Sequence, residues 1–372
     1  MITTESSFGS SSVTEWDSDD ERSLLEDLVL YEDPPLTFLQ AFLPSADLLL
    51  FMLRRSGARS LVKMGIVYLV LGMASFSKPD HTLLRFSWLA ALAVPTLLMA
   101  MALLFMAHIF VSKRQDAFES ARNQLWERIQ DGRALRKDGY DIYLPSTSRA
   151  NKHGIIFFPG ALINHTAYAS LAAKLSDKGI LVVVMSYGPS RLTMDVSECE
   201  TRAQLAMDDV AYELEYLGLD EDVPVQEWVL AGHSLGATLA LNAATNMDSV
   251  HKVILCGVGR DAMGVSSDLR SSNKQVLVVN GSNDPFVTDC TEEQKTDFQN
   301  CLPQACEDMT TKGRTTFVTI DGGNHAGFAH YGPQTYPKLD GERTLSIDEQ
   351  QEQFVQSTLE LLNIPHNNEL QN

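Results

Sequence analysis

A serine, an aspartate and a histidine stand at three points of the sequence where their side chains could do chemistry together. Ser234 lies in Gly-His-Ser-Leu-Gly, Asp284 in Gly-Ser-Asn-Asp-Pro, and His325 in Gly-Gly-Asn-His. A serine hydroxyl becomes an effective nucleophile only when a base takes its proton and a carboxylate orients that base. In this order, the three side chains predict nucleophilic attack on a carbonyl group.

Ser234 has the most specific surroundings of the three. An apolar run of strand length precedes it, and a segment rich in Ala and Leu follows it. Between a strand and a helix, the G-x-S-x-G pattern forms a turn so tight that it needs both glycines, and the serine hydroxyl stands at the carboxyl end of the strand. A serine that only capped a helix would account for Ser234 but not for the later acid and base.

Asp284 and His325 each follow a predicted strand. Asp284 comes shortly after residues 276–279, and His325 lies five residues beyond residues 316–320 in a loop of glycines. An aspartate before proline is also common in ordinary turns. Because the carboxyl ends of parallel strands meet at one edge of a sheet, we expect Asp284 as the orienting acid and His325 as the base.

A second histidine, His330, raises the alternative of a metal site. A spacing of five residues does not place two imidazoles on one helix face, and no neighbouring cysteine or HExxH pattern completes a ligand set. We therefore predict neither a metal nor a cofactor. His330 is expected to be a structural or pocket-lining residue near Phe328 and Tyr331.

Attack by a serine also requires donors that stabilise the negatively charged oxygen of the intermediate. One predicted donor is the backbone N–H of Leu235, directly after the serine. The other should come from the turn after the strand at residues 155–158, where the sequence reads Phe-Pro-Gly-Ala-Leu. We assign this second donor to Ala161, with Leu162 as the next candidate.

The elements that must position these residues follow an alternating pattern. Apolar runs of strand length are separated by helical stretches, which predicts an α/β fold with a mostly parallel sheet and helices on both faces. Residues 116–132 form a predicted amphipathic helix before the first of these runs. The predicted strands are residues 155–158, 180–185, 228–231, 253–256, 276–279 and 316–320.

The sequence before this domain is apolar, and residues 36–112 are predicted to be a membrane anchor. Residues 87–111 contain no charged side chain and are long enough to span a bilayer, and residues 61–77 are a second, shorter candidate. Basic residues flank the pair on its outer sides, which favours a hairpin with both ends in the cytosol. The catalytic domain, residues 115–372, is then cytosolic.

The first 35 residues are rich in Ser, Asp and Glu and are predicted to be a disordered acidic tail. The whole chain of 372 residues has a formal net charge of −19. That balance argues against a nucleic-acid partner, because such binding needs a basic face. The expected partners are a membrane and a small-molecule or lipid ester, and the sequence gives no indication of the oligomeric state.

Four stretches resemble a known family. PGALINHTAYASLAAKLSDKGILVVV, GHSLGA, NGSNDPFV and GGNHAGFAHYG are similar to the α/β-hydrolase subgroup related to dienelactone hydrolases. The resemblance covers about residues 120–362 and implies a serine hydrolase with Ser234, Asp284 and His325 at the catalytic positions. One departure is Ala237, where many members carry a second glycine.

We therefore expect a membrane-anchored serine hydrolase that cleaves an ester through an acyl-enzyme intermediate. Two alternatives remain open at this stage. A thioesterase or an acyltransferase would use the same triad with a different substrate or acceptor. A ligand-binding or scaffold protein would keep the fold without turnover, although such proteins usually lose a triad member.

Overall fold

The computed structural model describes residues 112–193, 195–259, 268–303 and 314–365, together with scattered helical positions between 93 and 108. The predicted acidic tail and most of the predicted anchor, including its first span, lie outside the described residues. Within the described part of the chain, no helix is both long and apolar enough to cross a membrane.

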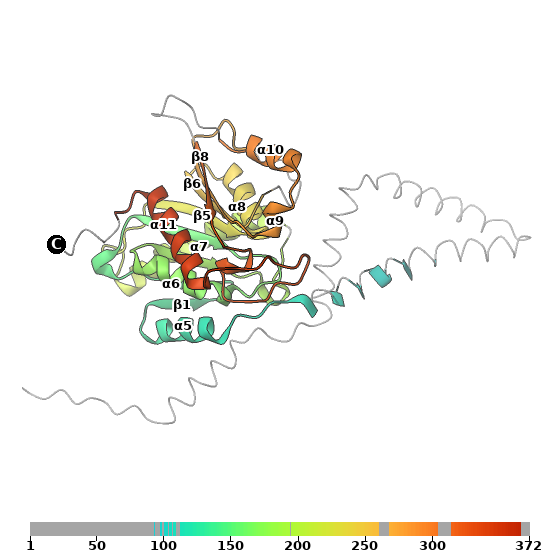
Figure 1. The fold of residues 1–372 in the computed structure, drawn as a ribbon. Helices are drawn as coiled ribbons and strands as arrows, with labels where there is room; N and C mark the ends of the chain where they lie inside the picture. The colour runs from blue at the N-terminus through green and yellow to red at the C-terminus, as the bar shows by residue number, and fades with distance from the viewer. Residues whose placement is uncertain are drawn as a thin grey trace, which may run out of the picture.

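The described strands form one sheet of eight, in the order β1-β2-β4-β3-β5-β6-β7-β8 (Figure 1). From β4 to β8 the neighbouring strands are parallel, and β1 and β2 pair antiparallel at one edge. The strands are β1 (Ala134–Lys137), β2 (Tyr140–Tyr143), β3 (His153–Phe158), β4 (Leu181–Met185), β5 (Glu227–His233), β6 (Lys252–Cys256), β7 (Gln275–Gly281) and β8 (Arg314–Ile320).

All six strands predicted from the sequence are present as β3 to β8. The hairpin of β1 and β2 was not predicted, because its sequences ALRK and YDIY mix charged and apolar residues over only four positions each. β8 also differs from the expected pattern. It is the outer strand beyond β7, and most of its side chains are exposed or half-buried.

Helices cover both faces of the sheet (Figure 1). Buried side chains of α5, α6 and α11 pack on one face, and those of α7, α8 and α10 pack on the other. The helix predicted at residues 116–132 is confirmed as α5. The helices are α5 (Glu119–Gln130), α6 (Ala169–Asp177), α7 (Val196–Leu217), α8 (Leu235–Asn246), α9 (Pro285–Thr288), α10 (Glu292–Asn300) and α11 (Ile347–Leu362), with 3₁₀ turns η1 (Thr147–Arg149), η2 (His165–Tyr168), η3 (Gly188–Ser190) and η4 (Ala326–Phe328).

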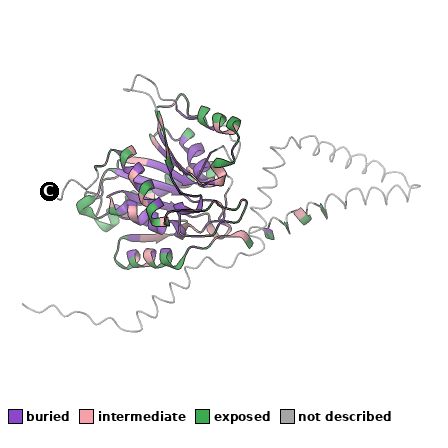
Figure 2. Cartoon of the chain, in the orientation of Figure 1, coloured by how far each residue is buried: buried purple, intermediate pink, exposed green. Residues whose placement is uncertain are grey.

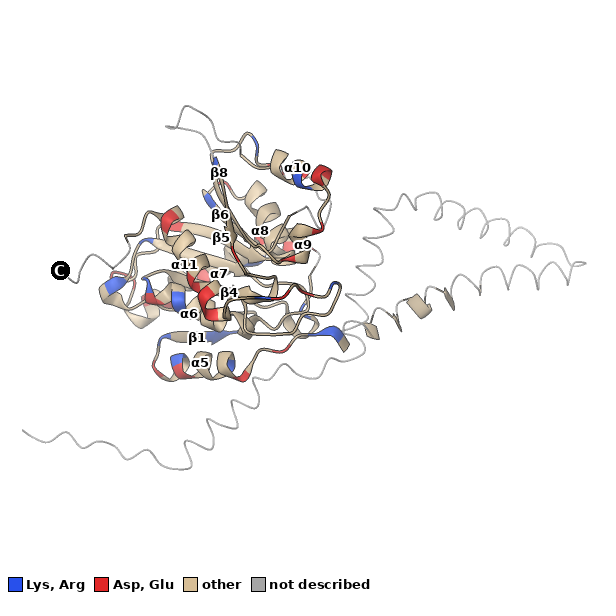
Figure 3. Ribbon diagram, viewed as in Figure 1, with Lys and Arg blue, Asp and Glu red and all other residues tan. Residues whose placement is uncertain are grey.

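The inner positions of the central strands are apolar because both faces of these strands are covered. In β3, Ile155 and Phe157 pack toward α5, α6 and α11, whereas Ile156 and Phe158 pack toward α7 and α8. Burying each such side chain contributes about 1.5–3 kcal/mol. Figure 2 shows the buried strands between partly exposed helices, and Figure 3 shows charged residues mainly on helices and loops. The sheet is thus a rigid support for the loops at its carboxyl edge.

Candidate functional site

Ser234 lies in a sharp turn between β5 and α8. Its backbone adopts φ 56° and ψ −118°, an angle that non-glycine residues rarely take. Both neighbouring glycines are required by close contacts. A Cβ on Gly232 would lie 2.2 Å from the carbonyl oxygen of Gly236, and a Cβ on Gly236 would lie 2.0 Å from that of Phe158. The turn therefore stores strain that packing must offset, as is common at functional sites.

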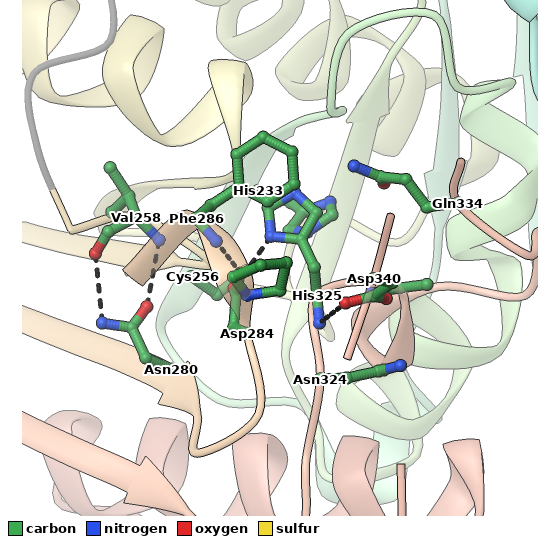
Figure 4. Close-up of polar contacts among 12 residues, drawn as sticks. His233, Cys256, Val258, Asn280, Asp284, Phe286, Asn324, His325, Gln334 and Asp340 are labelled. Carbon is green, nitrogen blue, oxygen red and sulfur yellow. Dashed lines mark hydrogen bonds and ion pairs between the residues drawn. The ribbon is translucent and has the colours of Figure 1, made fainter. Parts of the chain in front are cut away.

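Asp284 and His325 meet at the carboxyl ends of β7 and β8 (Figure 4). Oδ2 of Asp284 lies 2.8 Å from Nδ1 of His325, and both side chains are almost fully buried. The other carboxylate oxygen accepts a hydrogen bond of 2.8 Å from the backbone N–H of Phe286. Because an ionised carboxylate can only accept hydrogen bonds, the pair places the imidazole proton on Nδ1 and leaves the lone pair on Nε2.

The backbone around His325 is held by side chains far along the chain. The carboxylate of Asp340 accepts hydrogen bonds from the N–H groups of His325 (3.0 Å) and Ala326 (2.7 Å). Gln350 of α11 is fully buried; its amide accepts from the N–H of Asn324 and donates to the carbonyl of the same residue. Phe286 stacks on the His325 ring, with 4.1 Å between the centroids. These contacts fix both the loop and the plane of the imidazole.

The structure also brings His325 close to the turn that carries Ser234. The rings of His325 and His233 have centroids 4.5 Å apart. A Cβ on Gly257 would lie 3.0 Å from Cε1 of His325 and 2.9 Å from Cδ2 of His233. The Ser234 hydroxyl itself forms no hydrogen bond with His325 within the described residues. In serine enzymes without a bound substrate this contact is often long.

His233 is a neutral buried partner for this arrangement. Tyr168 accepts a hydrogen bond of 2.9 Å from the N–H of Gly160, so its own hydroxyl proton is free to bond Nδ1 of His233 at 2.8 Å. Burial, followed by the proximity of His325, lowers the pKa of His233 well below its usual value. The His233 ring therefore stays uncharged at neutral pH.

The two amides predicted to stabilise an oxyanion lie on neighbouring segments. Ala161 and Leu235 pack in one small apolar cluster with Leu162 and Leu192. Within the described chain, the N–H groups of Ala161 and Leu235 have no hydrogen-bond acceptor. The N–H of Leu162, the next candidate, donates to the carbonyl oxygen of Arg191 at 2.7 Å. Leu162 is therefore excluded as a donor, and Ala161 keeps an available N–H.

His330 lies apart from the Asp284–His325 pair. Its backbone N–H donates to Ala167, and Nδ1 of its ring lies 3.3 Å from the hydroxyl of Ser120 on α5. Burial lowers its pKa. The ring thus joins the loop after η4 to α5, which fits the expected structural role.

A cavity of about 510 Å³ lies beside this region, bounded by α5, β1 and the loop after β3. Its lining includes Arg122, Arg136, Trp126, Asn164 and Arg191, but none of Ser234, Asp284 or His325. The cavity is therefore distinct from the predicted catalytic residues. Among the described residues, no three His, Cys, Asp or Glu side chains gather in a way that could hold a metal ion.

The comparisons with known proteins bear on the fold. A family model described as the alpha/beta hydrolase family matches residues 154–352, more than half of the chain. The chain belongs to the alpha/beta hydrolase family. The expected hydrolase fold is thereby confirmed. In this family the residue at the turn after β5 is the nucleophile, which is the place that Ser234 occupies.

One solved structure that matches is esterase 2 of Thermogutta terrifontis, phosphoramylated by tabun. It shares 15% sequence identity with this alpha/beta hydrolase, covers 61% of this chain and 92% of its own, and has a TM-score of 0.38. No curated protein matches the sequence at a significant level.

Several residues of the site have no signal in the sequence. Tyr168, Asp340 and Gln350 act through contacts with residues 15 to 65 positions away. Their own neighbours in the sequence carry no motif that would single them out. His233 had a weak signal, because it stands inside the G-x-S-x-G pattern.

Proposed function

We propose that this alpha/beta hydrolase is a membrane-anchored serine hydrolase that cleaves an ester of a small molecule or lipid. The observation that carries the proposal is the 2.8 Å contact between Asp284 and Nδ1 of His325, next to the strained turn of Ser234. This contact favours the imidazole tautomer that a general base needs, because the proton lies on Nδ1 and Nε2 can accept another.

In the first half of the reaction, the Ser234 oxygen attacks the acyl carbonyl while its proton passes to Nε2 of His325. The tetrahedral intermediate then expels the alcohol, which takes that proton, and the acyl group stays on the serine. In the second half, water gives a proton to His325 and attacks the acyl-enzyme. The carboxylic acid leaves, and the proton returns to Ser234.

The amides of Ala161 and Leu235 hold the negative oxygen of both intermediates. Such a donor typically contributes about 10²–10³ in kcat, because it is already oriented before the charge develops. Asp284 keeps the ring oriented and stabilises the imidazolium that forms between the two proton transfers.

Labelling by a fluorophosphonate probe tests the nucleophile. We expect the full chain to be labelled and Ser234→Ala not to be labelled. Ser148→Ala, which changes an exposed serine in η1, is the matched control and should label like the natural protein. Equal labelling of the natural chain and Ser234→Ala would refute a serine mechanism.

The membrane anchor rests on the apolar sequence before the domain and on five described helical positions there. The side chains of Leu97, Leu98, Met101, Leu104 and Phe105 are each more than half exposed to solvent. Exposed apolar side chains on a helix are stabilised by lipid. The positive flanks favour a hairpin with the hydrolase domain in the cytosol.

Extraction of membranes with alkaline carbonate tests the anchor. Two arginines in place of Leu98 and Phe105 each cost about 2.5–3.5 kcal/mol near a bilayer centre, so the double variant should be released. Leu205→Arg changes an exposed leucine of α7 and should stay in the membrane fraction like the natural chain. Release of the natural chain by carbonate would overturn the proposal.

A panel of substrates identifies the kind of bond that the protein cleaves. Thioester hydrolysis and acyl transfer use the same Ser234 chemistry, so they differ only in leaving group and acceptor. A matched set of oxygen esters and thioesters of increasing chain length, with and without an added alcohol, separates them. We expect the highest kcat/KM for oxygen esters, as the resemblance to dienelactone hydrolases implies. A scaffold protein would turn over none of the panel.

A further inference from the structure

The residues that directly follow the predicted membrane span contact the loop that carries Ala161. Gln115 forms an isolated parallel β-bridge with Ile163. Its N–H donates to the carbonyl of Leu162 at 2.7 Å, and its own carbonyl accepts from the N–H of Asn164 at 2.9 Å. In Figure 1 this part of the chain enters the domain just before α5. The segment is therefore hydrogen-bonded to the loop after β3.

Arg191, at the end of η3, forms hydrogen bonds with both segments that meet at this bridge, through Gln115 and Leu162. Its backbone carbonyl accepts from the N–H of Leu162 at 2.7 Å. Its guanidinium donates through Nη1 to the carbonyl of Gln115 at 2.8 Å and pairs through Nη2 with Asp116 at 2.7 Å. The Arg191 side chain is 4% exposed. A fully charged group is buried here with backbone and carboxylate acceptors on two sides, which fixes its position.

Two non-glycine residues in this contact have strained backbones. Leu162 has a φ of 64° and Arg191 a φ of 52°, both in the left-handed region. Each such residue costs about 1–3 kcal/mol and persists only where its surroundings hold it. Here each is held by the other through the Leu162–Arg191 hydrogen bond. The N–H of Leu162 is thereby occupied, while that of Ala161 stays available.

We propose that Arg191 is a positioning residue for the oxyanion site, and that it acts by fastening the loop of Ala161 to the segment that follows the membrane anchor. We call Gln115, Asp116 and Arg191 the juxtamembrane clamp. The proposal rests on the proposed serine mechanism, since the loop matters only if Ala161 binds an oxyanion. In this proposal, the segment that follows the predicted membrane anchor helps to position the oxyanion donor.

The clamp should affect kcat more than KM. An oxyanion donor contacts the negative oxygen that exists in the transition state and not in the bound ester. A displacement of the Ala161 amide by about 1 Å can cost up to about 10²-fold in rate. Because the clamp touches no residue of the Asp284–His325 pair, the pH profile of the base should not change.

The test compares two buried arginines in the full chain in detergent or lipid. Arg191→Ala removes the clamp. Arg128→Ala removes a guanidinium of α5 that is equally buried and pairs with Asp177, remote from Ala161. Rates are divided by the concentration of active sites, titrated with a fluorophosphonate, so that misfolded protein does not count.

We expect Arg191→Ala to lower kcat per titrated site at least about tenfold, with KM changed less than about threefold. Arg128→Ala should change neither value by more than about twofold, although it lowers thermal stability. Arg191→Lys should fall between the natural chain and Arg191→Ala, because an ammonium keeps the charge but not the forked geometry. Equal kcat per site in the two alanine variants would overturn the proposal.

A second variant tests the backbone contact of Gln115. Gln115→Pro removes the N–H that bonds Leu162, whereas Gln115→Ala keeps it. We expect kcat per site to be several times lower in Gln115→Pro than in Gln115→Ala. Equal values would contradict the clamp. If the natural chain neither labels nor hydrolyses any ester, the proposed function fails instead, so the two failures are distinguishable.

Discussion

The described part of the hydrolase domain holds two aspartate–histidine pairs, each with a buried aspartate, in very different surroundings. In one, Asp284 contacts Nδ1 of His325 at 2.8 Å at the carboxyl edge of the sheet. In the other, Asp141 of β2 contacts Nε2 of His165 at 3.2 Å. Asp141 and Asp284 are both almost completely buried.

The two pairs differ in the third group that contacts the aspartate. Both oxygens of Asp141 are also bound by the guanidinium of Arg136, at 2.8 and 2.9 Å. Within the described chain, the Asp284 carboxylate contacts only His325 and the neutral N–H of Phe286. The carboxylate of Asp141 is shared between Arg136 and His165, whereas the carboxylate of Asp284 faces one imidazole and no arginine within the described chain. We therefore interpret the Asp141–His165 contact as a structural ion pair and the Asp284–His325 contact as the proposed acid–base pair.

The largest predicted difference is in turnover. His325→Gln should lower kcat by about 10⁴-fold or more, because it removes the proposed base. His165→Gln should keep kcat per folded molecule within about tenfold. Hydrolysis rates, with circular dichroism as the check on folding, measure both. Losses of similar size would mean that the two pairs do not differ in function.

Replacing each aspartate should affect a different property, namely turnover for Asp284 and the free energy of unfolding for Asp141. Asp284→Asn is expected to cost about 10⁴-fold in kcat through the wrong imidazole tautomer, with the fold retained. Asp141→Asn removes the buried carboxylate that pairs with the half-buried Arg136 and should lower the free energy of unfolding by about 3 kcal/mol. Urea unfolding followed by activity per folded molecule checks this. An Asp141→Asn protein of normal stability would contradict the assignment.

Low pH should lower the free energy of unfolding through the Asp141–His165 pair. Burial raises the pKa of Asp141, but His165 and Arg136 outweigh it and hold the pKa of this carboxyl well below its usual value. Its stabilising contribution is therefore complete above the unfolded pKa of about 3.9 and is lost as the pH falls toward the folded-state pKa.

The free energy of unfolding, measured between about pH 5 and pH 2, should fall more steeply in the natural chain than in Asp141→Asn. Asn cannot ionise, so it removes this part of the pH dependence. Parallel curves for the two proteins would show that Arg136 and His165 do not hold the carboxylate ionised.

The smallest expected effect is that of the remaining histidine of the same loop. His330→Ala removes a contact with Ser120 of α5 but touches neither pair. We expect kcat to stay within about threefold and the melting temperature to fall by a few degrees. Steady-state kinetics beside a thermal melt measures both. A loss as large as that of His325→Gln would reverse the roles given to the two histidines.

The sequence predicted the parts of the fold that have a local signature. The strands β3 to β7 each contain a continuous apolar run, β8 mixes apolar residues with threonine, and the turn of Ser234 carries its glycines within five residues. Asp284 and His325 could be predicted as site residues because each follows a predicted strand. The strands β1 and β2 could not be predicted, since β2 is placed by its pairing with β4 and β1 by its pairing with β2, and neither has a pattern of its own.

The supporting residues could not be predicted for a similar reason. Arg191, Tyr168 and Gln350 look like ordinary polar or aromatic residues in the sequence, and their roles come from partners brought near by folding. The exclusion of Leu162 as a donor likewise depends on one long-range hydrogen bond. Local patterns predict which groups do chemistry, while tertiary contacts decide how they are held.

The contact between Gln350 of α11 and the backbone of Asn324 makes two parts of the site depend on different elements. The turn of Ser234 lies between β5 and α8 and does not involve α11. The loop before His325 is completed only when α11 packs on the sheet. Local loosening of α11 should therefore disturb the proposed base and leave the turn of the proposed nucleophile in place.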